Sequence, residues 1–153
     1  MKRLHVNIAV KDIAESVRFY SALFATEPTV QKEDYAKWEL EDPRVNFSIG
    51  TCGRVAGLDH LGIQVESAAE LGELRERLTR TEGPLLEEGE VTCCYARSDK
   101  SWIVDPQGVR WEAFHTLGPA PVYGTSRRPT VVPQGEAACC GPVSAGSAAC
   151  CDR

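Results

Sequence analysis

The sequence predicts an α+β fold in which two βαβββ modules form an incomplete barrel around a metal site, followed by a disordered C-terminal tail. The first observation is a repeat: residues 5–10, HVNIAV, recur as residues 60–65, HLGIQV. The second is that residues 42–48, DPRVNFS, recur with one inserted glycine as residues 105–112, DPQGVRWE. Such a repeat indicates a duplicated supersecondary unit whose two copies pack together. The third is a change of composition near residue 117, where the periodic patterns stop.

The size and charge of the chain limit its class. A chain of 153 residues with 42% hydrophobic residues is large enough for one domain with its own core. Its net charge of -5 and its pI near 5.2 argue against a nucleic-acid or anionic-membrane partner. The N-terminus reaches Lys11 and Asp12 too early for the apolar region of a signal peptide. The sequence also lacks a run of about 18 apolar residues, so we expect a cytoplasmic protein with a small-molecule ligand.

The first module, residues 1 to about 52, starts with alternating branched residues at 4–10, which predict a strand. Asp12 precedes an amphipathic stretch that ends near Phe24, so we expect Asp12 to cap a helix. Short β-prone runs follow, separated by charged or Asp-Pro turn signals. They predict three antiparallel strands at 28–33, 35–40 and 45–50.

The second module, residues 58 to about 116, repeats this order after a glycine-containing linker. Its first strand is predicted at 60–65, and Ser67 is expected to cap a helix that extends to about Thr81. The segment 83–89 is predicted to be a longer connection than its counterpart in the first module. Three more strands are predicted at 91–96, 101–104 and 109–114.

The C-terminal part differs in composition from the domain formed by residues 1–116. Residues 117–153 are rich in Pro, Gly, Ala, Ser and Cys without sustained periodicity, which predicts a flexible tail. The chain has seven cysteines, and an odd number in a cytosolic protein indicates metal or thiol chemistry rather than a disulfide framework. Two adjacent cysteine pairs in the tail are candidate accessory thiols for a soft ion: Cys139, Cys140, Cys150 and Cys151.

Strand alternation places four equivalent positions of the repeat on one face of the expected sheet. They are His5 and Ser48 in the first module and His60 and Glu112 in the second. Two neutral imidazoles and one carboxylate leave about three open positions in an octahedral geometry, which suits Fe(II) and dioxygen. The same ligands could hold Zn(II) and activate water, so ligand type alone does not identify the metal.

Four stretches carry a resemblance to a known family: residues 17–24 (VRFYSALF), 58–65 (LDHLGIQV), 93–102 (CCYARSDKSW) and 105–108 (DPQG). Residues 1 to about 116 resemble the vicinal oxygen chelate superfamily, which includes glyoxalase I, bleomycin resistance proteins and extradiol dioxygenases. Within it, these stretches resemble the organoarsenical carbon-arsenic lyases and the cadmium-induced proteins.

The resemblance implies a metal held by His5, His60 and Glu112, with Cys93 and Cys94 as substrate-binding thiols. It further implies a non-haem Fe(II) dioxygenase, with dioxygen as co-substrate, that acts in arsenic resistance. Its substrates would be trivalent methyl- or aryl-arsenicals, whose carbon-arsenic bond is cleaved to release arsenite. Glyoxalase I would use a second metal-binding carboxylate in the first module, and here a serine stands at that position.

The adjacent cysteines suit such a substrate only in a special backbone conformation. Trivalent arsenic is a soft centre with two exchangeable positions, and two thiolates within about 4 Å of one another could chelate it. Neighbouring strand residues point to opposite faces, so we predict a bulge or a loop at Cys93 and Cys94. Lys100 follows in the same segment, and its charge would favour a thiolate or close over bound substrate. Tyr95 is predicted to line the substrate cavity.

Two alternatives remain open from the sequence. One is a thiol-based resistance protein that binds cadmium or arsenite without turnover. The other is an extradiol-type dioxygenase that acts on a catechol, for which Cys93 and Cys94 would be dispensable. Members of the superfamily often dimerise, so the sequence is compatible with a homodimer, although both modules lie in one chain and could close the site alone.

Overall fold

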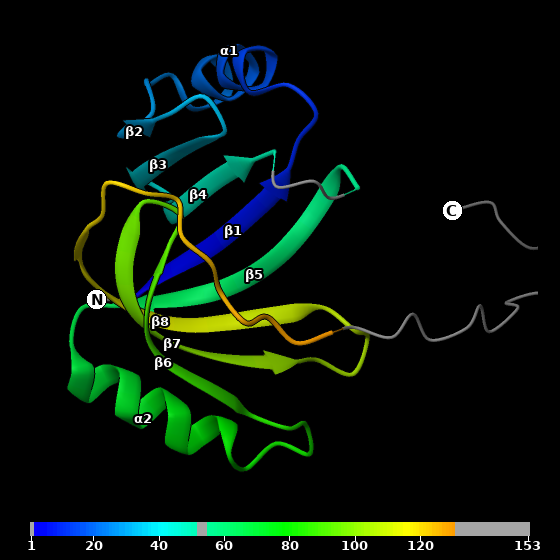
Figure 1. Ribbon diagram of the computed structural model, residues 1–153, viewed down its shortest axis with the longest axis vertical. Coiled ribbons are helices and arrows are strands. Elements are labelled where there is room, and N and C mark those ends of the chain that lie inside the picture. Colours follow the sequence, from blue (N-terminus) through cyan, green and yellow to red (C-terminus); the bar gives the residue numbers. More distant parts are fainter. Residues whose placement is uncertain (1, 52–54, 131–153) are drawn as a thin grey trace, which may run out of the picture.

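The computed structural model describes residues 2–51 and 55–130, which form one curled eight-stranded sheet with two helices outside the curl (Figure 1). The first module comprises β1 (Arg3–Ala9), α1 (Ile13–Phe24), β2 (Val30–Gln31), β3 (Tyr35–Glu41) and β4 (Arg44–Gly50). The second comprises β5 (Gly57–Val65), α2 (Ala68–Leu78), β6 (Leu86–Cys93), β7 (Ala96–Val104) and β8 (Arg110–Pro119). Both modules therefore have the predicted βαβββ order, and the predicted α+β half-barrel is confirmed.

The two modules join through their first strands. The strand order across the sheet is β2-β3-β4-β1-β5-β8-β7-β6. Within the modules, β1 pairs in parallel with β4 and β5 pairs in parallel with β8, whereas β1 and β5 pair antiparallel to each other. An antiparallel junction between equivalent strands relates the modules by an approximate twofold axis. One concave face therefore receives side chains from both modules.

Side-chain alternation separates the packed face of the sheet from this concave face. In the first module, Phe47 and Ile49 of β4 pack against Val17 of α1. In the second, Leu71 of α2 packs against Ala113 of β8. Burial of these apolar side chains beneath the helices leaves the intervening strand positions free to point into the concave face.

Both helices begin at the predicted caps. The Asp12 carboxylate accepts a hydrogen bond of 2.7 Å from the backbone N–H of Glu15, and the Ser67 hydroxyl accepts one of 3.2 Å from that of Glu70. These bonds satisfy amide donors that have no partner inside the first helical turn. Across residues 2–51 and 55–130, no helix is long and apolar enough to cross a membrane.

Strand β6 differs from the prediction because it begins at Leu86, inside the segment expected to be a loop. The pairing of β6 with β7 shifts between Glu87 and Gly89, so Glu88 is the extra residue of a β-bulge. Gly89 has a φ of 75°, a conformation that glycine adopts without strain. The bulge therefore accommodates the glycine and glutamate residues that suggested a loop.

The predicted tail boundary at residue 117 is too early. Strand β8 continues to Pro119, and residues 120–130, which we call the C-terminal strap, cross the open side of the sheet (Figure 1). The strap pairs with β6 through a bridge between Gly124 and Cys93, and a side chain at Gly124 would lie 2.0 Å from the Thr92 carbonyl oxygen. The composition of this segment predicted disorder, but the absence of a side chain at Gly124 allows the strap to approach β6. Residues 131–153, including the four tail cysteines, lie outside the described residues.

Candidate active site

The concave face brings His5, His60 and Glu112 together. His5 of β1 is in register with Gly62 of β5, and Gly62 is in register with Glu112 of β8. His60 pairs with Asn7, which lies two residues after His5 on the same face of β1. The side chains of one residue from β1, one from β5 and one from β8 therefore converge across three adjacent strands.

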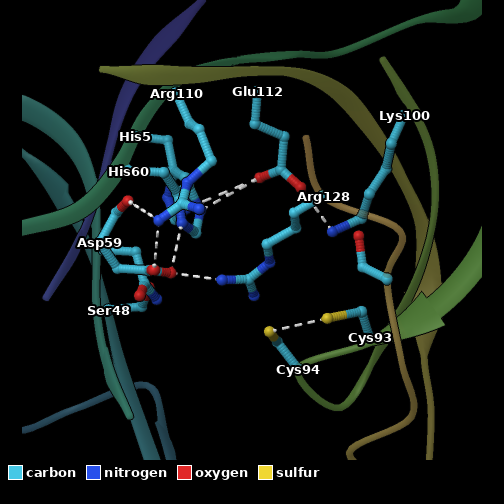
Figure 2. Close-up of polar contacts among 12 residues, drawn as sticks. His5, Ser48, Asp59, His60, Cys93, Cys94, Lys100, Arg110, Glu112 and Arg128 are labelled. Carbon is cyan, nitrogen blue, oxygen red and sulfur yellow. Dashed lines mark hydrogen bonds and ion pairs between the residues drawn. The ribbon is translucent and has the colours of Figure 1, made fainter. Parts of the chain in front are cut away.

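Three potential ligand atoms meet at this point (Figure 2). The two Nε2 atoms of His5 and His60 lie 3.1 Å apart. Oε2 of Glu112 lies 3.7 Å from Nε2 of His5 and 3.6 Å from Nε2 of His60. All three side chains are buried. The arrangement is compact enough for all three residues to reach a single metal ion.

Hydrogen bonds fix the orientation of both imidazoles. Nδ1 of His5 lies 3.0 Å from the backbone carbonyl oxygen of Asn46, and Nδ1 of His60 lies 2.8 Å from the Asp59 carboxylate. Both partners are acceptors, so each Nδ1 carries a proton and donates it. With Nδ1 engaged in this way, the Nε2 atoms of both rings are directed at one another and at Glu112. A metal ion between these atoms fits the donor set.

The protonation states at the site also suit a cation. Burial, with a further contribution from the charge of His60, lowers the pKa of His5 to about 3, so its imidazole is neutral at physiological pH. Burial alone would raise the pKa of Glu112, but the Lys100 charge and the interactions with the two histidines hold it well below its usual range. A neutral imidazole at His5 and an ionised carboxylate at Glu112 are protonation states that metal binding requires.

Gly62 leaves the space in which this cluster forms. A Cβ at this position would lie 2.6 Å from the Glu112 carbonyl oxygen and 3.3 Å from Cδ2 of His5. Any side chain at Gly62 would therefore separate His5 and Glu112, which flank it in the sheet. The absence of a side chain forms a cradle between them, which is a second feature that fits a bound ion.

Ser48 forms part of the wall rather than a fourth ligand. Its side chain is fully buried, and its hydroxyl accepts a hydrogen bond of 2.7 Å from the Asn7 amide. This neutral hydroxyl stands at the position that Glu112 occupies in the second module. The first module therefore supplies no carboxylate at this point. The site is therefore asymmetric, with its carboxylate on the side of β8.

Cys93 and Cys94 lie at the turn between β6 and β7, with their sulfurs 3.1 Å apart. Cys94 and Tyr95 have φ values of 58° and 61°, which are uncommon for residues with side chains. This left-handed turn places two neighbouring thiols on the same side, which a regular strand would not do. The predicted departure from regular strand geometry is confirmed. The strain stored in such a turn is typical of functional sites.

The two thiols differ in acidity. The hydrogen bond from Cys94 lowers the pKa of Cys93 to about 6, with help from the charges of Lys100 and Arg128 and against the effect of burial. The same hydrogen bond and burial raise the pKa of Cys94. The site therefore favours the anionic form of Cys93 over that of Cys94.

This difference predicts a specific labelling pattern. In site-resolved mass spectrometry, Cys93 should be alkylated by iodoacetamide at lower pH than Cys94, because only the thiolate reacts and the site favours the Cys93 anion. Cys94 should remain protected at that pH. Replacing Cys94 with Ala removes the hydrogen bond that stabilises the thiolate, so the midpoint of Cys93 alkylation should move to higher pH. An unchanged midpoint would show that Cys94 does not activate Cys93.

Lys100 connects the thiols to the carboxylate. Its Nζ donates a hydrogen bond of 2.6 Å to Oε1 of Glu112, which leaves Oε2 directed at the histidines. Burial opposes its charge, but Glu112 and the two cysteines raise the pKa of Lys100 above its usual value. Lys100 was predicted to favour a thiolate. In the structure it also contacts Glu112 directly, which the sequence did not suggest.

The cluster and the thiols line one cavity of about 40 Å³, which is partly open to solvent. Its walls also contain Tyr35, Phe114 and Arg128. Tyr95, which was predicted to bind substrate, lies outside this lining. The Tyr95 hydroxyl instead donates a hydrogen bond of 2.8 Å to Asp34, because the turn directs its ring away from the cavity.

Asp59 belongs to the site, although strand alternation alone would place its side chain on the face opposite to that of His60. Asn7 pairs with His60 whereas Ile8 pairs with Leu58, so Asp59 is the extra residue of a β-bulge in β5. The bulge brings the Asp59 carboxylate to the same side as His60, where it orients the imidazole. An acidic residue directly before the histidine was the only available signal in the sequence.

Arg128 was missed because it belongs to the segment that composition assigned to the tail. It forms an ion pair with Asp59, and its guanidinium lies over the Trp102 ring at 5.6 Å from the ring centroid. Figure 2 shows the guanidinium between Asp59 and the cysteine pair. The C-terminal strap therefore supplies part of the site.

The half-barrel of paired βαβββ modules, with a candidate metal site between the modules, defines a class of protein. A family model described as the Glyoxalase/Bleomycin resistance protein/Dioxygenase superfamily matches residues 2–113. The chain belongs to this superfamily.

Within this superfamily, the chain is similar to several relatives that carry specific names. The chain is 45% identical over 120 residues to a trivalent organoarsenical cleaving enzyme of Bacillus sp. (strain MD1), covering 76% of this chain and 74% of the relative. It is 33% identical over 150 residues to a protein of the same name from Thermomonospora curvata, covering 97% and 94%. It is 35% identical to the cadmium-induced protein CadI of Mycobacterium bovis, covering 96% and 99%. These names match the resemblance found in the sequence.

Solved structures show the same fold at low sequence identity. Homoprotocatechuate 2,3-dioxygenase from Arthrobacter globiformis superposes with a TM-score of 0.58 and 19% identity, covering 78% of this chain and 37% of that one. An Mn(II)-bound glyoxalase from Novosphingobium aromaticivorans superposes with a TM-score of 0.57 and 16% identity, covering 83% and 44%. At this identity the comparison concerns the fold alone.

Proposed function

We propose that this protein is an Fe(II)-dependent dioxygenase that cleaves the carbon-arsenic bond of trivalent organoarsenicals such as methylarsenite and releases arsenite. One observation carries the proposal: two thiols 3.1 Å apart share one cavity with a cluster of two histidines and a glutamate. The names of the relatives at 33–45% identity support the same substrate class. Free thiols suit the cytoplasm, which we propose as the compartment of the reaction.

The cysteine pair would capture the arsenical. The Cys93 thiolate attacks arsenic and displaces one hydroxide. Cys94 then forms the second arsenic-sulfur bond, and its proton leaves with the other hydroxyl group as water. Two sulfurs on one rigid turn bind arsenic through both exchangeable positions, which orients the remaining carbon substituent.

The second half of the site would hold the metal. His5, His60 and Glu112 are the proposed ligands, and Fe(II) bound there would supply the activation of dioxygen that cleavage requires. Lys100 holds Oε1 of Glu112, so that one carboxylate oxygen remains for the metal. The positive charge of Lys100 also favours the thiolate of Cys93.

The decisive test uses wild-type protein loaded with Fe(II) under anaerobic conditions. We expect arsenite to appear from methylarsenite when air is admitted, and not without iron or without air. Stoichiometric methylarsenite binding with no arsenite would favour a sequestering protein instead. Ring cleavage of a catechol in the absence of arsenite release would favour an extradiol dioxygenase. Either of these results would overturn the proposed reaction.

A further inference from the structure

A second cavity lies on the convex face of the sheet, between α2 and the strands of the second module. Helix α2 lies along the outer side of this module (Figure 1). The cavity has a volume of about 690 Å³ and is partly open to solvent. Pockets that bind small molecules typically have volumes of about 300–1,000 Å³. The apolar part of the lining includes Ile63 of β5, Leu74 and Leu78 of α2, Ile103 of β7 and Trp111 of β8.

In the first module, aromatic side chains fill the corresponding region between helix and sheet. The rings of Tyr20 and Phe24 of α1 pack on Phe47 of β4, with centroid distances of 4.5 and 5.1 Å from the Phe47 ring. Phe47 is the equivalent of Trp111 in the repeat that relates residues 42–48 to residues 105–112. The two modules therefore present an aromatic residue of the sheet to their helices at equivalent positions.

The helix of the second module carries smaller side chains opposite this aromatic residue. The inward-facing residues of both helices are spaced by three and then four residues: Val17, Tyr20 and Phe24 in α1, and Leu71, Leu74 and Leu78 in α2. Leu74 and Leu78 therefore stand where the first module has a tyrosine and a phenylalanine. The space that two aromatic rings occupy in one module is open beside Trp111 in the other. An aromatic ligand suits such a space, because a flat ring packs well on an indole.

The charged part of the lining is acidic. Glu82, which follows α2, and Asp105, in the turn between β7 and β8, both line the cavity, and none of its described lining residues is a lysine or an arginine. The hydrogen bond from the backbone N–H of Val109, together with one of 3.2 Å from the Trp111 indole, lowers the pKa of Asp105. Asp105 is therefore ionised at neutral pH, and the two carboxylates favour a cationic group beside the apolar walls.

We propose that this cavity is a second ligand site, which binds a small molecule with an aromatic ring and a positively charged amino group. The ring packs against Trp111 and the two leucines of α2, and the ammonium group lies toward Glu82 and Asp105. The ligand does not reach the metal-site residues or the thiols, because the side chain of Trp111 points to the face of β8 opposite to that of Glu112. The site is therefore independent of the proposed reaction and of its substrate.

The test uses the full-length, metal-free protein with reduced thiols and follows the tryptophan indole N–H signals by two-dimensional NMR. Trp111→Phe identifies the Trp111 signal. The probes are 1-naphthylmethylamine, 1-naphthoate, which has the ring with the opposite charge, and n-butylamine, which has the charge without the ring. We expect 1-naphthylmethylamine to shift the Trp111 signal saturably and to bind at least about 10-fold more tightly than either of the other probes.

Two pairs of variants locate the binding. Leu78→Phe introduces the residue that the first module has and should weaken binding of 1-naphthylmethylamine by about 10-fold, because the new ring occupies the cavity. Leu23→Phe makes the same change at an exposed position of α1 and should leave binding unchanged. Glu82→Gln should weaken binding by about 3-fold, as expected for one exposed charge pair. Glu33→Gln removes an exposed carboxylate of the first module and should have no effect.

The absence of a saturable Trp111 shift, or equal affinities for 1-naphthylmethylamine and 1-naphthoate, would overturn the proposal. Equal weakening by Leu23→Phe and Leu78→Phe would do the same. If Leu78→Phe does not fold, the comparison of Glu82→Gln with Glu33→Gln decides by itself. A second copy of the chain is the competing occupant. In that case sedimentation would show a dimer that Leu78→Phe dissociates, the Trp111 signal would move with protein concentration, and the ligand site would be excluded.

Discussion

Replacing Glu112 with Gln should abolish turnover and weaken metal binding by on the order of 100-fold. Zinc-finger peptides bind Zn(II) through four ligands with about 10–16 kcal/mol, so the loss of one charged ligand is expected to cost about 3 kcal/mol. The amide keeps the shape of the side chain but removes the negative charge that faces both Nε2 atoms. Anaerobic titration with Fe(II), or with Co(II) as a spectroscopic substitute, measures the affinity, and arsenite release measures the activity.

The same change should also destabilise the fold, because Glu112 is the buried partner of Lys100. Their side chains are 3% and 7% exposed, and leaving a buried cation unpaired costs about 3 kcal/mol. Combining Glu112→Gln with Lys100→Met should restore thermal stability without restoring metal affinity. Glu90→Gln removes an exposed carboxylate from β6 and serves as the charge-matched control. Normal metal affinity in the Glu112 variant would exclude this residue as a ligand.

The repeat was sufficient to predict that His5, His60 and Glu112 lie close together, because a duplication carries geometric information. Equivalent positions in two copies lie near the approximate twofold axis when the copies pack through equivalent strands, as β1 and β5 do. No further sequence signal was needed to place His5 and His60 close together. Parity along the last strand of each module then placed Glu112 and Ser48 on the same concave face.

What could not be predicted depends on local departures from that regularity. Asp59 reaches His60 only because an extra residue in β5 breaks the alternation. Glu88 anchors the strap because of a second bulge, in β6. A bulge adds one residue to one strand without a marked change in composition. Periodicity alone therefore assigns residues at the bulge to the wrong face of the sheet.

The strap shows a different limit of sequence reasoning. Its proline and glycine content is typical of disordered segments, and no periodic pattern marks it. Its order comes from contacts with distant residues, such as the hydrogen bonds of Ser126 and Arg127 to Glu88 and the ion pair of Arg128 with Asp59. Contacts between positions far apart in the chain leave no local signature, and Arg128 was missed for that reason.

Replacing Cys93 with Ser should reduce kcat/KM for methylarsenite by about 100-fold or more and leave metal affinity unchanged. The variant can form only one arsenic-sulfur bond, and loss of the second attachment point lowers affinity by about 10²–10⁴-fold. It also removes the sulfur whose anionic form the site favours, and the anion is the nucleophilic form. Arsenite release and anaerobic metal titration on the same preparation separate the two effects.

The comparison with Cys94→Ser and Tyr95→Phe makes this result specific. Cys94→Ser should lose activity to a similar extent, because both sulfurs are needed to hold arsenic in one orientation. Tyr95→Phe changes a neighbouring residue of the same turn that lies outside the cavity lining, and it should retain activity. A Cys93 variant with full turnover would contradict a thiol-bound substrate, since a reaction that uses only the metal cluster has no need of the strained turn that holds Cys94 beside Cys93.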